Sequence, residues 1–226
     1  MSFTYIEKPS ASPYVDVIWH TVDTSDGTYL AAADGSWDMI FTTTKEGQTT
    51  VRLSGPSSTT TPVHYKQGNR NVGMRLKQGA FFTHIAAAEV VDVTEYLPMP
   101  SPDTFLLGGH LLHVPSYETM DNFIAQLENL QLLSQDPIVR AVLEGAKYGA
   151  SRRSVQRRFG HSIGLTPAYI AQIERAWRAV ELLQQGAAIT AVVHELGYAD
   201  QAHLNRTIKK VTGYTPRQNA KRNEPL

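Results

Sequence analysis

The stretch VQRRFGHSIGLTP at 155–167 decides how the second part of this chain folds, because it recurs at 204–216 as LNRTIKKVTGYTP. The two copies align without a gap, and each matched pair is separated by 49 residues. In both copies, apolar residues four positions apart are expected to be buried along one helical stripe. Arg157 and Arg206 lie off that stripe and face outward. An internal repeat of this kind indicates one structural unit present twice.

Each copy ends in the same helix stop and restart. Gly164 and Gly213 supply the left-handed turn that follows a helix, and the Thr-Pro pair after each glycine begins the next helix. Between the copies, residues 167–185 carry one apolar stripe, which predicts a helix roughly 28 Å long. One turn of B-DNA is about 34 Å. A spacer of that length would therefore place two arginine-bearing helices in successive major grooves on one face of a duplex.

Helical spacing extends through nearly all of the chain after Pro137. The connections hold only a few residues, which predicts a compact helical bundle. We expect Asp136, Ser151 and Thr166 to be helix caps. The candidate helices are 137–147, 152–160, 167–185, 188–196 and 201–211, with a short one starting at Pro216.

Charge divides the chain near Ser134, although its formal net charge is +0. Residues 1–133, the first half, hold 7 Lys and Arg against 14 Asp and Glu, whereas residues 134–226, the second half, hold 14 against 7. A basic half attracts phosphate chains at long range, so it points to a polyanion partner. We expect these halves to be two domains with different roles.

The overall composition is that of a folded globular protein, with 42% hydrophobic and 19% charged residues. The chain has no cysteine, which excludes disulfides, thiolate catalysis and cysteine-based zinc sites. No apolar run approaches the roughly 18 residues of a membrane span, and the N-terminal residues lack the pattern of a signal peptide. A cytoplasmic location without a membrane partner is expected.

The first half has the alternation of half-buried strands. Residues 36–43, 49–55 and 71–79 alternate apolar and polar side chains between Gly, Pro, Ser and Thr. Residues 55–64 are typical of a loop, 97–104 form a proline-rich connector, and helical spacing returns at 117–133. The expected fold class is therefore α+β, with a mostly β first domain, barrel-like or a small sandwich, and an all-α second domain.

The repeat carries the motifs of a known family. Ser151, Arg153, Val155, Arg157 and Phe159 stand at the places of a first recognition helix that reads S-x-R-x-L-x-R-x-F. Residues 189–216 follow the pattern of a second motif. The second half thus resembles the DNA-binding domain of the AraC/XylS family of bacterial transcription regulators, in which a long helix joins two helix-turn-helix motifs. Parts of the first half are similar to an N-terminal domain found in some members.

Two departures from the family pattern stand out. The helix that supports the first motif should end in an apolar pair such as Leu-Ala, yet Glu144 and Gly145 occupy those places. In the second motif, Val193 replaces the usual Ala, while Leu204 and Ile208 replace Phe. These changes predict a less well supported first unit and leave both basic helices in place.

The resemblance implies a sequence-specific transcriptional regulator that inserts two recognition helices into successive major grooves of its operator. It implies neither catalysis nor a cofactor, and RNA polymerase would be a partner of an activator. Arginine pairs bidentately with guanine and glutamine with adenine, whereas phosphate contacts position the protein without specifying sequence. Carried over by position, the expected base-contacting residues are Arg153, Gln156, Arg157, Gln201, Ala202, His203 and Arg206. The expected phosphate-contacting residues are Arg152, Arg158, Asn205, Lys209 and Lys210.

Two roles remain open for the first half. It is a small-molecule sensor if its aromatic residues line a cavity, so that an effector shifts the second half between two arrangements. Alternatively, it is mainly a homodimerisation platform, through the N-terminal domain or the 117–133 helix. Aromatic residues on strands also form ordinary core. The candidate effector-binding residues are Tyr14, Trp19, Tyr29, Trp37 and Tyr65.

An enzyme-like first half is the alternative from another class. His110 and His113 lie three apart with Glu118 beyond, and such residues can hold a metal. The spacing lacks the H-x-H of cupin metal sites, and no nucleophile elbow, phosphate loop or H-E-x-x-H occurs. We therefore expect no metal site and no catalytic residue, with a metal- or ligand-binding domain fused to a DNA-binding module as the second reading.

Overall fold

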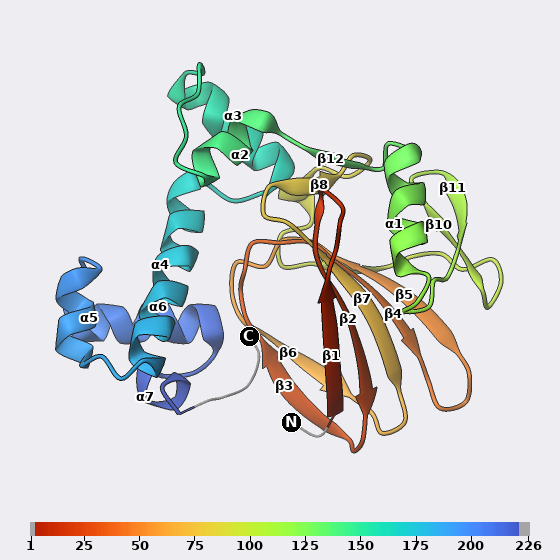
Figure 1. Ribbon diagram of the computed structural model, residues 1–226, viewed down its shortest axis with the longest axis horizontal. Helices are drawn as coiled ribbons and strands as arrows, with labels where there is room; N and C mark the ends of the chain where they lie inside the picture. The colour runs from red at the N-terminus through yellow and green to blue at the C-terminus, as the bar shows by residue number, and fades with distance from the viewer. Residues whose placement is uncertain (1–2, 222–226) are drawn as a thin grey trace.

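The computed structural model describes residues 3–221 and has a β-rich first half followed by a helical second half (Figure 1). This confirms the expected α+β class. The strands are β1 (Phe3–Pro9), β2 (Val15–Asp23), β3 (Gly27–Ala31), β4 (Asp38–Thr43), β5 (Thr49–Ser54), β6 (Thr61–Tyr65), β7 (Arg70–Leu76), β8 (Ala80–Phe82), β9 (Thr94–Tyr96), β10 (Thr104–Leu107), β11 (His110–His113) and β12 (Leu133–Gln135). The helices are η1 (Ala87–Glu89), α1 (Met120–Asn129), α2 (Pro137–Leu143), α3 (Arg152–Ser162), α4 (Pro167–Gln184), α5 (Ile189–Glu195), α6 (Gln201–Thr212) and α7 (Pro216–Asn219).

A six-stranded antiparallel sheet organises the first half, in the order β1-β2-β7-β4-β5-β9. The sheet has β1 and β9 as its edges, and three further strand pairs, β3-β6, β8-β12 and β10-β11, lie outside it. A barrel is therefore not confirmed, and the small sandwich describes the layers better. One face of the sheet is covered by α1 and the β10-β11 hairpin (Figure 1).

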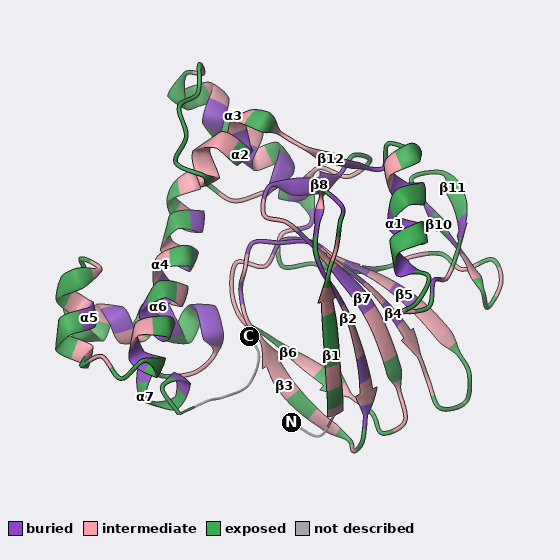
Figure 2. Ribbon diagram, viewed as in Figure 1, coloured by how far each residue is buried: buried purple, intermediate pink, exposed green. Residues whose placement is uncertain are grey.

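The core of the first half lies on that covered face. Met39 and Phe41 of β4 alternate with outward-facing neighbours, as a half-buried strand requires. Phe41 packs edge-on against Phe105 of β10 and Phe123 of α1, with ring centroids 5.6 Å apart in both pairs. The apolar stripe of α1 is buried in this core, so the helix covers the core of the first half in a single chain (Figure 2).

The strands expected at 36–43, 49–55 and 71–79 correspond to β4, β5 and β7. The loop expected at 55–64 is wrong at its end, because Thr61–Tyr65 forms β6 and pairs with β3. Its Ser, Thr and Pro content is typical of a turn, and the strand forms only through pairing with a distant segment. The helix expected at 117–133 is shorter, since α1 ends at Asn129 and the chain turns into β12.

Helices α3 to α7 lie close to their expected bounds, and the three expected caps, which belong to α2, α3 and α4, are confirmed. Asp136 accepts from the amides of Ile138 and Val139, Ser151 from Ser154, and Thr166 from Tyr169. The exception is α2, which ends at Leu143 and not at 147. Gly145 stands just beyond with a φ of +65°, a left-handed conformation that ends the helix.

The two halves contact each other along α4 and at the ends of α3 and α6. The domain boundary at 133/134 stays a prediction. Three tryptophan or tyrosine side chains bond across the contact: Trp37 Nε1 to the Ser162 carbonyl at 3.4 Å, Trp177 Nε1 to the Ala33 carbonyl at 2.9 Å, and the Tyr169 hydroxyl to the Ser58 carbonyl at 2.9 Å. These bonds fix the end of α3 and the long helix α4 against the first half.

Candidate nucleic-acid interface

The first candidate recognition helix, α3, separates its buried and outward-facing residues cleanly. Val155 and Phe159 are buried in a cluster with α2 and α4, and Phe159 is 0% exposed. The residues predicted to contact bases share the opposite, exposed face; they are Arg153, Gln156 and Arg157, with Arg152 beside them. Arg158 differs, because it is half-buried and its Nη1 lies 2.6 Å from Asp136 Oδ2. Its guanidinium therefore ties α3 to the start of α2.

The second candidate recognition helix, α6, repeats this division. Leu204 and Ile208 are buried against α4 and α5, while Gln201, Ala202 and Arg206 are exposed. The other residues predicted to contact DNA differ in exposure and in their contacts within the protein. His203 is half-buried beside the Tyr198 ring, with centroids 5.2 Å apart, and Asn205 is half-buried. Lys209 and Lys210 are both exposed, and the Lys210 ammonium lies 4.9 Å from the centre of the Tyr169 ring.

Both candidate recognition helices are held by the first half at their C-terminal ends. The Val211 carbonyl accepts from the Ala33 amide at 2.7 Å, and the Lys210 carbonyl accepts from the Thr60 amide at 3.1 Å. The end of α3 is held by the Trp37 bond to Ser162. The N-terminal turns point away from the sheet in Figure 1. Those turns are the part of a recognition helix that contacts base edges.

The repeated glycines also contact the first half. Gly164 has a φ of +73° and Gly213 a φ of +80°, which confirms the left-handed turns expected from the repeat. A Cβ on Gly164 would lie 2.8 Å from the Ala87 carbonyl oxygen, and one on Gly213 would lie 2.5 Å from Leu30 Cδ1. Glycine is therefore required twice over, by backbone conformation and by close approach.

Helix α4 joins the two units and contacts both of their cores. Its apolar stripe is buried, with Ile170, Ile173 and Ala176 in the cluster around α3 and Val180 and Leu183 in the cluster around α6. At 1.5 Å per residue, its 18 residues span about 27 Å. The length agrees with the expected spacer.

A cavity of about 980 Å³ lies between the uncovered face of the sheet and α4. Its floor is a chain of polar side chains that crosses four strands. The Asn71 amide nitrogen donates to the Thr21 hydroxyl at 2.9 Å, the Thr42 hydroxyl donates to Asn71 Oδ1 at 2.8 Å, and Arg52 Nη2 donates to Thr42 at 3.3 Å. The Arg52 Nε is buried without a partner among residues 3–221.

Trp19 lies flat across the middle of this floor. It pairs in register with Gly73 of β7, and a Cβ on Gly73 would collide with the indole ring. The indole N–H lies near the Asp38 carboxylate on β4 and favours its ionised form. Burial raises the pKa of Asp38 to about 7, with a further rise from the nearby Asp34 carboxylate. The facing wall comes from the second half, through Ile173, Glu174, Trp177, Thr212 and Tyr214.

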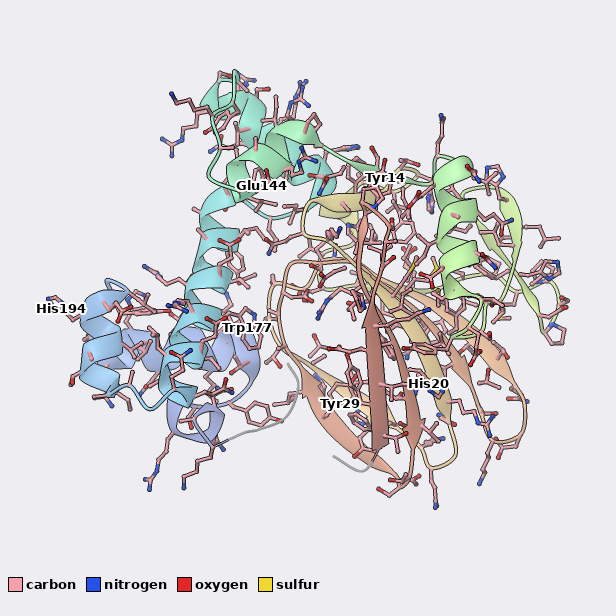
Figure 3. All side chains as sticks on the ribbon, viewed as in Figure 1. Tyr14, His20, Tyr29, Glu144, Trp177 and His194 are labelled. Atoms are coloured by element: carbon pink, nitrogen blue, oxygen red, sulfur yellow. The ribbon has the colours of Figure 1, made fainter. Side chains whose placement is uncertain are left out.

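The predicted effector-binding aromatics divide into two groups. Trp19, Tyr29 and Tyr65 line the cavity. Trp37 is 1% exposed inside the core, and Tyr14 packs against the same core, so the structure places both outside the cavity lining. Asp38, Arg52 and Trp177 also line the cavity, and the sequence did not assign them to it. Figure 3 labels Trp177 on α4, which faces the sheet only in the folded chain.

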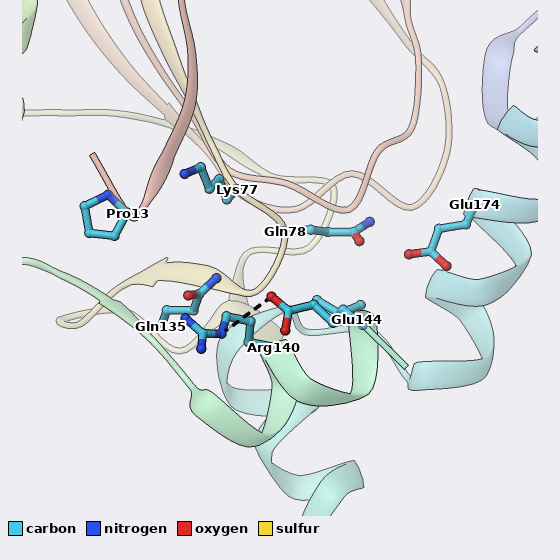
Figure 4. A pocket seen from close by; sticks show the side chains of 8 residues that line it. Pro13, Lys77, Gln78, Gln135, Arg140, Glu144 and Glu174 are labelled. Carbon is cyan, nitrogen blue, oxygen red and sulfur yellow. Dashed lines mark ion pairs between the residues drawn. The ribbon is translucent and has the colours of Figure 1, made fainter. Parts of the chain in front are cut away.

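A smaller pocket of about 400 Å³ lies where α2 meets the first half (Figure 4). Arg140 and Glu144 on its rim form an ion pair, with Nε 3.6 Å from Oε1, and Glu174 of α4 faces them. Burial raises the pKa of the Glu174 carboxyl. The pocket continues the seam between the two halves.

The histidines considered as metal ligands lie apart from the cavity, on β11, and both are exposed. His113 Nδ1 is 4.0 Å from Asp103 Oδ2. Among residues 3–221, no group of three or more His, Asp or Glu side chains is arranged to hold a metal ion. Nor is any described helix long and apolar enough to cross a membrane.

A comparison with known protein families agrees with the helix arrangement of the second half. Residues 145–222 match the family model described as a helix-turn-helix domain. These residues form an AraC-type helix-turn-helix domain. The AraC-type domain spans α3 to α7 with α2 just before it. No curated protein matches the chain.

Solved structures of ToxT from Vibrio cholerae are similar to the whole chain. One ToxT structure is 10% identical, with 97% of this chain and 98% of that chain covered and a TM-score of 0.46. A ToxT structure from strain O395, bound to (E)-4-(8-methylnaphthalen-1-yl)but-3-enoic acid, is 11% identical with the same coverage and a TM-score of 0.44.

Proposed function

We propose that this chain is a sequence-specific DNA-binding transcription regulator, with α3 and α6 entering successive major grooves of one operator. The single observation that carries this proposal is the pair of capped helices, each with exposed arginine on its outer face and its C-terminal end fixed against the first half. The AraC-type match over residues 145–222 supports the same function. A regulator without catalytic activity accounts for this arrangement better than an enzyme does.

The exposed residues in the first two turns of each helix are the proposed base readers. Arg153, Gln156 and Arg157 serve on α3, with Gln201 and Arg206 on α6, because long donor-rich side chains there reach guanine and adenine edges. Ala202 and His203 lie on the same turn of α6. For phosphate contact, the exposed Arg152 and Lys209 are better placed than the other three residues. Arg158 is paired with Asp136, Lys210 lies over Tyr169, and Asn205 is half-buried.

The first test is DNA binding by wild-type protein and by the double variant Arg157→Ala with Arg206→Ala, on fragments selected from genomic DNA. The double variant should lose specific binding and remain folded, because both side chains are exposed. Wild-type binding should weaken by orders of magnitude between about 50 and 200 mM salt, as several phosphate contacts release counterions. Equal binding by the double variant at about 150 mM salt would contradict the proposal.

The cavity is the proposed effector site. Its floor offers hydrogen-bond donors and acceptors from Arg52, Asn71 and Asp38 together with the indole face of Trp19, which suits a small polar molecule with a flat side. Such a molecule would also touch Trp177 of α4, whose indole N–H holds Ala33, and Ala33 in turn holds the end of α6. Binding would thereby bias the position of one recognition helix.

A small-molecule extract of cells tests the effector proposal. It should raise the Tm of the wild-type protein by mass action. The Ile40→Trp variant carries an indole in place of a smaller cavity-lining side chain, and its Tm should not rise. Equal shifts for the two proteins would place the ligand elsewhere.

Homodimerisation and contact with RNA polymerase stay predictions, and the apolar stripe of α1 is already buried within the chain.

A further inference from the structure

The connection between α2 and α3 differs from its counterpart in the second unit. In the second unit, the connection packs down, with Tyr198 buried and Leu196 half-buried against the core of α4 and α6. In the first unit, residues 145–149 are all exposed, and Tyr148 has 46% of its surface accessible. A Cβ on Gly145 or Gly149 would meet nothing within 4 Å. This segment therefore does not contribute to the core of its unit.

The segment also continues the basic surface of α3. No acidic residue occurs from Gly145 to Ile173, a range that includes Lys147 and the four arginines of α3. The acidic residue just before it, Glu144, is paired with Arg140. Among residues 3–221, Tyr148 makes no hydrogen bond and no ring contact. An exposed lysine and tyrosine here lack a structural role within the protein.

Position decides what the segment can contact. It runs along the outer end of α3, on the side away from the sheet (Figure 1). Residues at the start of a recognition helix contact base edges, so residues just before that start lie at the rim of the groove, where the phosphates are. Lysine ammonium and tyrosine hydroxyl groups are common donors to phosphate oxygens.

We propose that residues 145–149 are a further DNA-contacting element, in which Lys147 and Tyr148 donate to phosphates beside the groove that α3 enters. This inference rests on the proposed function. The second unit has no such element, because its connection is packed against the protein core. In the first unit, the supporting helix α2 ends early at Leu143, so the unit is less well supported by packing. A phosphate contact from residues 145–149 would strengthen its binding to DNA.

The test measures DNA affinity of Lys147→Ala and of the double variant with Tyr148→Phe, by fluorescence anisotropy on the operator fragment and on unrelated DNA. Lys45→Ala is the matched control, since Lys45 is exposed at the distant β4–β5 turn. Loss of one phosphate contact should make the negative slope of log K against log salt shallower by about one and weaken binding to both DNAs alike. The double variant should bind more weakly again.

The outcomes separate this inference from the proposed function. Unchanged affinity and salt slope in both variants, while wild type binds its operator, overturn the role of residues 145–149 alone. Loss confined to the operator would make Lys147 a base reader, and this also overturns the phosphate assignment. Failure of the wild type to bind any DNA overturns the proposed function together with the inference.

Discussion

Replacement of Gly164 by alanine should damage the contact between the two halves more than an equivalent replacement elsewhere. Gly164 and Gly186 both follow a helix and both have left-handed backbones, with φ of +73° and +89°. A Cβ on Gly164 would lie 2.8 Å from the carbonyl oxygen of the fully buried Ala87 and would also collide with Val91. A Cβ on Gly186 would meet nothing within 4 Å. The pair therefore separates backbone strain from collision.

The expected magnitudes follow from these surroundings. Left-handed backbone costs an alanine roughly 1–2 kcal/mol, and this applies to both variants. Insertion of a methyl group into a packed contact adds about 1–3 kcal/mol, and this applies to Gly164→Ala alone because backbone atoms must move. Gly213→Ala should fall between the two, since its closest obstacle is the end of the flexible Leu30 side chain.

Urea unfolding followed by tryptophan fluorescence measures these differences, because Trp37 and Trp177 lie at the contact between the halves. The order of destabilisation should be Gly164→Ala, then Gly213→Ala, then Gly186→Ala. If Gly164→Ala and Gly186→Ala lower the free energy of unfolding equally, the first half does not press on the end of α3, and the description of the contact is wrong.

Two further predictions concern pH. Burial raises the pKa of the folded-state Asp38 carboxyl to about 7, against roughly 3.9 in an unfolded chain. The folded state therefore stays protonated at pH values where the unfolded chain has lost the proton. The free energy of unfolding should fall as pH rises from about 4 to about 7. Asp38→Asn should remove this fall, which Tm values at pH 5 and pH 8 will reveal; an unchanged pH dependence would refute it. For Asp136, burial acts to raise the pKa, but hydrogen bonds from Arg158 and two backbone amides outweigh it and lower the pKa. Its contribution should be present above about pH 4 and lost as pH falls through the lowered value, so Asp136→Asn, which keeps a capping oxygen, should lose less stability on acidification than wild type.

Local signals predicted the second half well. The repeat placed two outward-facing arginine helices, two glycine stops and the capped restarts, because each depends on residues close together in sequence. The end of α2 shows the limit of such signals, since the helical spacing continued to Lys147. Gly145 supplied a stop that the spacing alone did not reveal.

Long-range contacts could not be predicted in the same way. Trp19 and Trp37 both lie on or beside strands of alternating pattern, yet one lines the cavity and the other is buried in the core. Which face becomes core depends on where α1 and α4 pack, and a single sequence does not state this. For the same reason, the collision of Gly164 with Ala87 was invisible, although the need for glycine was clear.

Hydroxyl-radical footprinting of the wild-type protein on a bound genomic fragment tests whether α3 and α6 enter successive major grooves. Two protected stretches are expected on one face of the duplex, centred about one helical turn apart, because α4 holds α3 and α6 at the ends of a spacer of about 27 Å. Arg157→Ala should weaken one stretch and Arg206→Ala the other. A single protected stretch, or two that both variants leave unchanged, would contradict this binding mode.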